Sequence, residues 1–154
     1  MADSGSKVKK TPFVSAAIEK LRGVGMRITS PRIAILETLD QSDLPLNAYA
    51  LQEAVTLTGK KVDVVSVYRT LKVLRELDLV HYVQSSDGYL ACRLEGEHGS
   101  ASEMIVCDTC GNVMELDIDP CAMTDLSEQL SSLGFKASRI TIEVEGVCKS
   151  CDGQ

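Results

Sequence analysis

"DVVSVYRTLKVLRELDLVHYVQSSDGYLACRL", residues 63–94, contains two hydrophobic patterns in succession. Its first part predicts an amphipathic helix, because Val67, Leu71 and Leu74 share one face while the charged residues lie largely off it. The pattern then alternates, and the runs "LVHYV" and "YLACRL" flank the polar turn "QSSDG". A helix followed directly by a β-hairpin is typical of the end of a winged helix-turn-helix, in which the hairpin is the wing.

Three short helices are predicted before this segment, and each opens with a residue that favours the N-cap position: Thr11, Ser30 and Asn47. Proline follows the first two, at the position where a helix tolerates it best. We therefore expect residues 1–84 to form a winged-helix DNA-binding domain, with wing strands that extend to about residue 94. The helix before the wing would be the recognition helix.

The remaining sequence predicts a second, smaller unit of mixed structure. The segments "EMIVC" and "NVMELDI" indicate strands on either side of "CDTCG", "DPCAMTDLSEQLSSLGF" indicates a helix, and "KASRITIEVEGVC" indicates a strand. The expected fold class is therefore α+β, an N-terminal winged helix-turn-helix followed by a small α/β domain. We expect residues 85–99 to form a wing strand and hinge, and residues 100–154 to form the second domain.

The two halves of the chain differ in charge. Residues 1–84 carry 12 Lys and Arg against 9 Asp and Glu, whereas residues 85–154 carry 4 against 13. A basic first half favours contact with a polyanion such as nucleic acid, although the whole chain has a net charge of −6. No apolar run approaches the ~18 residues of a membrane span and no signal-peptide pattern opens the sequence, so we expect a cytoplasmic protein without a membrane partner.

Four of the six cysteines form two C-x-x-C pairs, Cys107 with Cys110 and Cys148 with Cys151. Two such turns supply the tetrahedral Cys₄ shell of a structural zinc site. The alternatives are two disulfides, which a reducing compartment disfavours, or a redox switch. A thioredoxin-type pair would open a helix after a strand, whereas "CDTCGNVMEL" continues as a strand.

A second metal site is suggested by the hairpin. If residues 85–88 form a four-residue loop, Gln84 pairs with Tyr89 and His81 lies opposite Cys92. Opposed residues have Cβ atoms ~4.5–5.5 Å apart, which suits two ligands of one zinc ion. The alternative is a buried cysteine beside a hydrogen-bonded histidine.

Two more ligands would complete this second shell. His98 lies beyond the second strand and can fold back, and a carboxylate is expected from the second unit. Glu115 is the best placed, with Glu95, Glu97 and Glu103 as competitors. One thiolate, two imidazoles and one carboxylate favour zinc over harder ions.

The segments "GMRITSPRIAILETL", "VSVYRTLKVLRELDLVHYV", "MIVCDTCGNVMEL" and "GVCKSC" together resemble the ferric uptake regulator family of metal-responsive repressors, over roughly residues 13–151. Within that family the sequence is most similar to the zinc uptake regulator branch. The resemblance implies that a regulatory zinc is bound by His81, Cys92, His98 and Glu115. The histidine cluster that precedes the first C-x-x-C pair in the iron- and peroxide-sensing branches has no counterpart in "SASEMIVC".

The resemblance also implies that the partner is double-stranded operator DNA, bound by a homodimer that the acidic second half assembles. Tyr68 and Arg69 are the candidate base contacts, because arginine pairs bidentately with guanine and an aromatic ring packs on thymine methyl groups. The candidate phosphate contacts are Ser66, Arg27, Lys60 and Lys61. For the two lysines the alternative is a solvated surface.

The resulting hypothesis is a zinc-responsive transcriptional repressor, not an enzyme, with one structural and one regulatory zinc ion per chain. The regulatory ion would clamp the wing to the dimerisation domain, so that zinc uptake genes are repressed when zinc is plentiful. The alternatives are a redox- or other-metal-responsive repressor of the same family, or a thiol oxidoreductase. Cys121 is expected to be a packed bystander.

Overall fold

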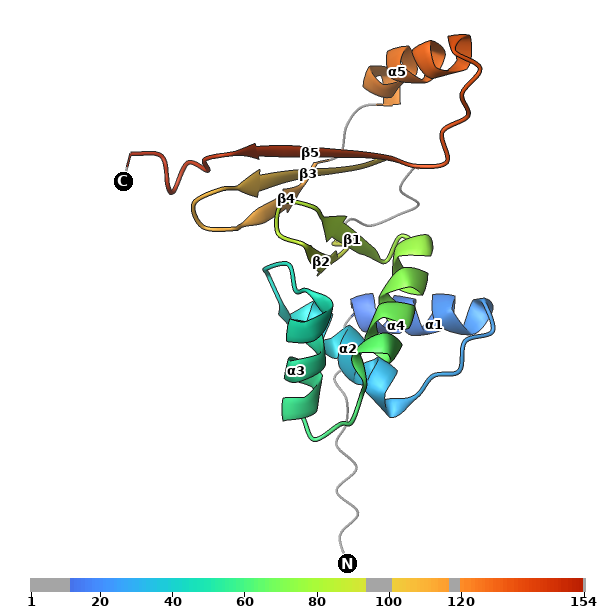
Figure 1. The fold of residues 1–154 in the computed structure, drawn as a ribbon, viewed down its shortest axis with the longest axis vertical. Coiled ribbons are helices and arrows are strands. Elements are labelled where there is room, and N and C mark those ends of the chain that lie inside the picture. Colours follow the sequence, from blue (N-terminus) through green and yellow to red (C-terminus); the bar gives the residue numbers. More distant parts are fainter. Residues whose placement is uncertain (1–11, 94–100, 117–119, 154) are drawn as a thin grey trace, which may run out of the picture.

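The structure is a computed structural model and describes residues 12–93, 101–116 and 120–153. The described elements are α1 (Pro12–Gly23), α2 (Ser30–Gln41), α3 (Ala48–Leu57), α4 (Val64–Glu76), β1 (Val80–Val83), β2 (Gly88–Ala91), β3 (Ala101–Cys107), β4 (Val113–Glu115), α5 (Pro120–Ser132) and β5 (Ile140–Gly146). Figure 1 shows α1–α4 at one end and the β3–β5 sheet with α5 at the other, with the β1–β2 hairpin between them. The predicted α+β fold class is confirmed. No helix in these ranges has the length and apolar character needed to cross a membrane.

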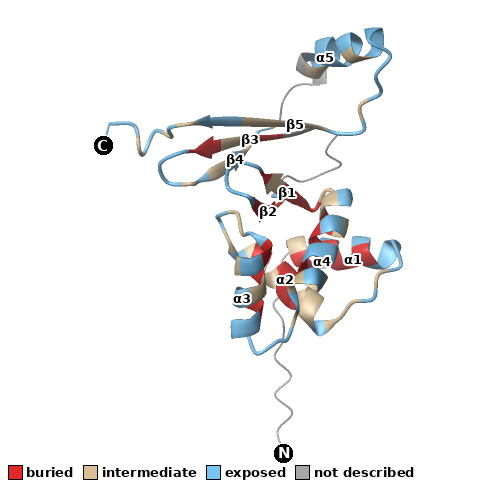
Figure 2. Ribbon diagram, in the orientation of Figure 1, coloured by how far each residue is buried: buried red, intermediate tan, exposed pale blue. Residues whose placement is uncertain are grey.

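One apolar core joins the first four helices to the hairpin. Each helix contributes leucines with almost no exposed surface, and they are Leu21, Leu36, Leu39, Leu51, Leu71 and Leu74. Figure 2 shows buried residues in red on the helices of this bundle. Because full burial of one leucine side chain contributes about 1.5–3 kcal/mol, the bundle and hairpin form one stable unit.

The helix starts follow the sequence closely, with one correction. The side chains of Asn47 and Asp63 accept hydrogen bonds from the backbone N–H groups of Ala50 and Ser66, which caps α3 and α4. Ser30, expected as a cap, is instead the first residue of α2, and the N-cap position before it is occupied by threonine. The predicted cap Thr11 lies outside the described residues.

The hairpin β1–β2 with its turn, hereafter the wing, has a different register from the one expected. His81 lies opposite Leu90, not opposite Cys92, because the turn uses residues 84–87 and not 85–88. The predicted pairing is therefore wrong by two residues. Since side chains alternate with a period of two, a shift of two leaves His81 and Cys92 on the same face as diagonal neighbours.

Gly88 explains the register. A Cβ atom on Gly88 would lie 2.6 Å from the side chain of Pro45 and 3.0 Å from its backbone carbon, so a residue without a side chain is needed here. The next residues, Tyr89 and Leu46, exchange two backbone hydrogen bonds of 2.8 and 2.9 Å. The segment between α2 and α3 thus fixes the second wing strand from outside the hairpin.

We expect Gly88→Ala to destabilise the protein by about 1–3 kcal/mol, the usual cost of overpacking, because backbone as well as side-chain atoms would have to move. Gly23→Ala is the matched control, since a Cβ at Gly23 meets no heavy atom within 4 Å. Urea unfolding of both variants checks this. Equal midpoints for the two variants would contradict the packing argument.

The second part of the chain is a sheet with strand order β4-β3-β5, hereafter the C-terminal sheet. β3 pairs antiparallel with β4 and parallel with β5. A parallel pair needs a crossover connection, and α5 lies within the connection from β4 to β5. None of the α5 residues whose exposure is described is buried, and Figure 2 shows the helix pale blue over most of its length.

A small second core connects the wing to the C-terminal sheet. Val83 and Leu90 from the wing pack against Met104 and Val106 of β3, with Val113 at the side. The wing therefore lies between two apolar surfaces, one on the helices and one on the sheet. This placement brings residues near 81 and 92 close to the end of β4.

Candidate metal centres and nucleic-acid interface

The two C-x-x-C pairs meet at one edge of the C-terminal sheet. Cys107 ends β3 opposite Gly146 of β5, so the turn after β3 and the turn after β5 lie side by side. The sulfur atoms of Cys107, Cys110, Cys148 and Cys151 all lie within 4.8 Å of one another. Parallel pairing of two distant strands thus builds a four-sulfur cluster, as the sequence predicted.

The spacing of these sulfurs suits a tetrahedral metal. Cys110 Sγ and Cys148 Sγ are 3.8 Å apart, and all six cysteines are free thiols. Two thiolates bound at ~2.3 Å to a tetrahedral zinc ion are about 3.8 Å apart, whereas a disulfide requires ~2.05 Å. The arrangement therefore fits a Cys₄ zinc shell better than two disulfides.

Backbone amides prepare one of the thiols for metal binding. The backbone N–H of Cys148 donates to Cys107 Sγ at 3.3 Å. This bond, together with one from the backbone of Cys110, lowers the pKa of Cys107 to about 6. The left-handed φ of +71° at Gly111 allows the tight turn that follows the first pair. Cys107 is therefore largely a thiolate at neutral pH, the form that binds metal.

The second cluster joins the wing to the C-terminal sheet. Glu115 Oε2 lies 3.4 Å from His81 Nε2 and 3.6 Å from Cys92 Sγ. Tetrahedral zinc with ordinary bond lengths separates nitrogen from oxygen by about 3.4 Å and sulfur from oxygen by about 3.6 Å. Among the described residues, Glu115 is the carboxylate that lies with His81 and Cys92.

Four other candidates for this shell are not part of the cluster as the structure describes it. His98, the fourth ligand implied by the sequence, lies outside the described residues, as do the competing residues Glu95 and Glu97. Glu103 is described and buried in β3, but it does not belong to the cluster. The structure thus brings together three of the four residues named from the sequence.

The charges in this cluster depend on one another. Burial lowers the pKa of His81, but contacts with Cys92 and Glu115 outweigh burial and raise it to about 9. Burial raises the pKa of Glu115, while His81 and the backbone of Arg93 lower it, with a net decrease. Without metal, the group is therefore an imidazolium beside a carboxylate, and a metal ion must displace the proton on His81 to bind.

This electrostatic arrangement predicts a pH dependence when the His81 cluster is metal-free. The pKa of His81 is raised from 6.5 to about 9, so its contribution to stability is complete below pH 6.5 and is lost as the pH rises through 9. Urea unfolding between pH 6.5 and 9, with the cysteine cluster loaded, should show a steeper loss of stability in the parent than in His81→Ala. Parallel curves would contradict this assignment.

Glu115 also connects the cluster to the helices. Its second oxygen, Oε1, accepts the backbone N–H of Arg93 at 2.8 Å. The Arg93 guanidinium binds both the side chain and the carbonyl oxygen of Asp40, at 2.6 and 2.5 Å, in the last turn of α2. A carboxylate of the C-terminal sheet is thus linked through Arg93 to a helix of the N-terminal bundle.

The recognition-helix candidates are exposed on α4. Tyr68 is 47% exposed, and Arg69 follows it on the surface. Tyr49 of α3, 64% exposed, meets the Tyr68 ring edge-on with centroids 6.5 Å apart. Sequence reasoning did not select Tyr49, although an aromatic residue in the first turn of a predicted helix was a usable signal. The structure makes it part of the same exposed surface.

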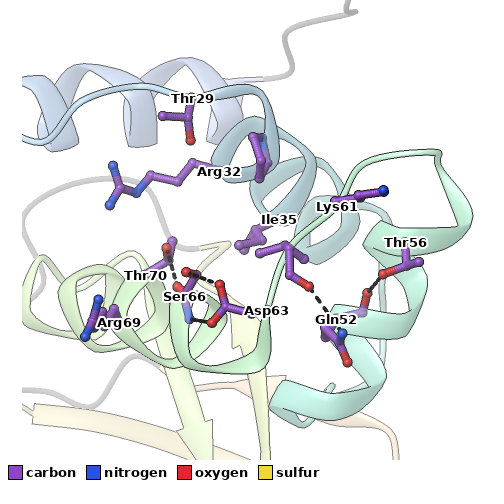
Figure 3. Close-up of a pocket in the computed structure, with 12 residues that line it drawn as sticks. Thr29, Arg32, Ile35, Gln52, Thr56, Lys61, Asp63, Ser66, Arg69 and Thr70 are labelled. Atoms are coloured by element: carbon purple, nitrogen blue, oxygen red, sulfur yellow. Dashed lines mark hydrogen bonds between the residues drawn. The ribbon is translucent and has the colours of Figure 1, made fainter.

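A cavity of about 670 Å³ opens between α2, α3 and α4. Figure 3 shows Arg32, Lys61 and Arg69 around it, so its wall carries positive charge. Ser66 also lines the cavity, but its hydroxyl donates to Asp63 at 2.7 Å and is already engaged. The guanidinium of Arg32 binds the backbone carbonyl of Arg27. Lys61 and Arg69 thus line one cavity together with the carboxylate of Asp63.

The two remaining phosphate candidates lie outside this cavity. Arg27 and Lys60 are both exposed, which is compatible with a DNA contact and equally with a solvated surface. Cys121, in the first turn of α5, is also exposed. The expectation that Cys121 is packed is therefore wrong, because α5 does not lie against the core of the sheet.

Comparison with known proteins identifies the family. The sequence profile described as the ferric uptake regulator family matches residues 23–145. The chain belongs to this family. It is 31% identical over 129 residues to the zinc uptake regulation protein of Escherichia coli (strain K12), covering 82% of this chain and 73% of that protein. It is 32% identical over 140 residues to the peroxide operon regulator of Bacillus subtilis (strain 168), covering 88% of this chain and 90% of that one.

Solved structures of the family agree with the fold. A zinc uptake regulator complexed with zinc and DNA superposes with a TM-score of 0.80 and 27% sequence identity, over 92% of this chain and 96% of that chain. This overlap includes both the helical bundle and the C-terminal sheet. The chain therefore shares its fold with this regulator over most of its length.

Proposed function

We propose that this chain is a zinc-responsive transcriptional repressor that binds palindromic operator DNA as a homodimer when zinc-loaded and thereby controls zinc uptake genes. The cluster of His81, Cys92 and Glu115 carries the proposal, because it joins the wing to the C-terminal sheet at spacings that suit zinc. The likeness to a zinc uptake regulator complexed with zinc and DNA supports it. Two zinc ions per chain are proposed, one held by the four cysteines and one by this cluster with His98.

The mechanism depends on where the ligands come from. His81 belongs to the wing, Cys92 directly follows the wing, and Glu115 belongs to the C-terminal sheet. A bound zinc would supply the charge that holds all three in one shell. His81 would give up its proton and offer Nε2 to the metal, while Oε1 of Glu115 would keep its hydrogen bond from the backbone N–H of Arg93. Arg93 in turn holds Asp40 at the end of α2. The conformation that presents α4 to DNA is thereby favoured over an open one.

We propose the following domain assignment. Residues 1–84 bind DNA, residues 85–99 form a wing strand and hinge, and residues 100–154 carry dimerisation and metal binding. Large apolar side chains are exposed in the last part, and they are Met114, Leu116, Leu126, Leu133, Phe135, Val144 and Val147. A second copy of the chain would remove them from water, which supports the homodimer. A DNA-binding role also favours the cytoplasm.

A redox-responsive repressor is the second candidate, because the chain is also similar to a peroxide operon regulator. The buried His81–Cys92–Glu115 cluster favours zinc, since thiolate ligands disfavour harder ions. A thiol oxidoreductase is disfavoured, because Cys110 is followed by strand β4 and not by a helix. We therefore do not assign an enzymatic activity.

The proposed function is tested with the parent protein. Operator sequences are selected from a random DNA pool at saturating zinc, and affinity is then measured while free zinc is varied. We expect two zinc ions per chain and DNA binding that disappears when the weaker ion is chelated. DNA binding that persists after chelation, or that responds to peroxide and not to zinc, would overturn the proposal.

We expect Arg69→Ala to weaken operator binding by about 1–3 kcal/mol, roughly 5- to 150-fold, if the guanidinium reads a guanine. Zinc content and zinc affinity should be unchanged, because Arg69 lies on α4 away from both clusters. Glu76→Ala on the same helix is the matched control. Fluorescence anisotropy with operator and scrambled DNA measures both affinity and specificity, and equal losses on the two DNAs would mean that Arg69 contacts phosphate only.

A further inference from the structure

The C-terminal sheet contacts the helical bundle at a point away from both metal clusters. Arg139, the residue before β5, donates from Nη2 to the backbone carbonyl of Arg75 at 3.0 Å. The same nitrogen lies 3.2 Å from Asp78 Oδ1. Arg75 is in the last turn of α4, and its carbonyl also accepts the backbone N–H of Asp78 at 3.2 Å. The Arg139 guanidinium adds a second donor and a positive charge at this end of the helix, where a cation is favourable.

Glu143 of β5 makes a second contact, with the turn of the wing. Its two carboxylate oxygens accept the backbone N–H groups of Gln84 at 2.8 Å and Ser85 at 2.9 Å. Burial raises the pKa of Glu143, but the side chain of Ser85 and the two backbone N–H groups outweigh burial and lower the pKa. The carboxylate is therefore ionised at neutral pH and accepts hydrogen bonds from two backbone N–H groups. Such charge-assisted hydrogen bonds are stronger than hydrogen bonds between neutral groups.

The two contacts together fix an orientation. Arg139 and Glu143 are four residues apart along an extended segment, about 13 Å at the rise of a β-strand. Arg139 binds the end of α4, and Glu143 binds the turn of the wing. The end of α4 also contacts the wing directly, because the Arg75 guanidinium lies 5.4 Å from the centre of the Tyr82 ring of β1. In Figure 1 the sheet crosses above both the upper end of α4 and the wing. Two separated attachment points resist rotation, which a single one would allow.

We propose that Arg139 and Glu143 form a metal-independent latch that positions α4 and the wing on the C-terminal sheet. This proposal rests on the proposed function and adds to it two residues that position the domains. Neither residue belongs to a metal cluster of the described chain. The latched state already holds His81 and Cys92 beside Glu115. The zinc ligands are thus preorganised by contacts that contain no metal.

The latch has a thermodynamic consequence for zinc. If only a fraction of molecules is latched, the apparent dissociation constant for the regulatory zinc equals the intrinsic constant divided by that fraction. Loss of the latch therefore weakens zinc binding although every ligand is intact. At saturating zinc the docked state is restored, and DNA affinity returns with it. A DNA contact or a purely structural residue would not show this combination.

The test uses Glu143→Gln and Arg139→Ala in the full chain with the cysteine cluster loaded. The glutamine keeps the shape of glutamate but turns an NH₂ group toward one of the two peptide N–H donors. Glu145→Gln and Lys136→Ala are the matched controls, because both residues are exposed nearby. Regulatory zinc affinity is measured without DNA by competition with a chelator, and operator affinity is then measured as free zinc is varied.

Each latch variant should raise the regulatory zinc dissociation constant by about 5- to 50-fold, the usual range of coupling between sites. The controls should stay within about twofold of the parent, and operator affinity at saturating zinc should recover to within about threefold. An unchanged zinc constant in Glu143→Gln, or a DNA defect that saturating zinc does not repair, would overturn the latch. If the parent binds no DNA at any zinc level, the proposed function fails, whereas the zinc measurement without DNA still decides the latch.

Discussion

Cys148→Ser is expected to unfold the C-terminal sheet and to abolish dimer formation. The described buried residues of this part are few, namely Glu103, Met104, Val106 and Cys107. Such a small core stabilises a unit only weakly, and a structural zinc site contributes about 10–16 kcal/mol of apparent binding free energy in small peptides. Loss of one thiolate opens the shell that ties the end of β5 to the turn after β3, so most of that stabilisation disappears.

Hydrogen exchange and size-exclusion chromatography measure this effect. Amides of β3 and β5 in Cys148→Ser should exchange at the rate of unfolded peptides, while those of α1–α4 stay protected by their own core. Cys121→Ser is the control, because that thiol is exposed and lies outside both clusters. Protected β5 amides and an intact dimer in Cys148→Ser would show that the cysteine cluster is not what holds the sheet.

Cys92→Ser is expected to remove zinc-dependent DNA binding while leaving the fold intact. The serine hydroxyl is a poor zinc ligand, so the shell formed with His81 and Glu115 loses its thiolate. The change in volume is small, and the wing keeps its apolar contacts through Val83 and Leu90. Operator affinity at saturating zinc should fall at least ~100-fold, the upper end of typical allosteric coupling.

Zinc content separates this effect from unfolding. Cys92→Ser should retain one zinc per chain and its dimeric state, whereas Cys148→Ser should lose both. Glu115→Gln should resemble Cys92→Ser, since an amide oxygen carries no charge for the metal, and should also weaken the contact with the backbone of Arg93. Full zinc-dependent binding by both variants would show that the regulatory site lies elsewhere in the chain.

Local patterns were enough to predict much of the site. The two C-x-x-C pairs specify their own ligands, because two intervening residues direct both thiolates to one point. His81 and Cys92 could also be predicted as neighbours, since a strand period of two keeps them on one face even when the register moves by two. Glu115 was preferred over Glu103 from its position five residues after Cys110, and the family resemblance implied the same residue.

The sequence by itself determined the order of helices and strands, the fold class and the residues able to bind metal, because periodicity, capping and pair spacing act over a few positions. Tertiary structure decided what depends on contact between distant segments. Pro45 sets the wing register against Gly88, Tyr49 meets Tyr68, and β5 reaches both α4 and the wing through Arg139 and Glu143. These contacts depend on shape and hydrogen bonding between elements that are distant in the chain. They therefore produce no periodic pattern in the sequence.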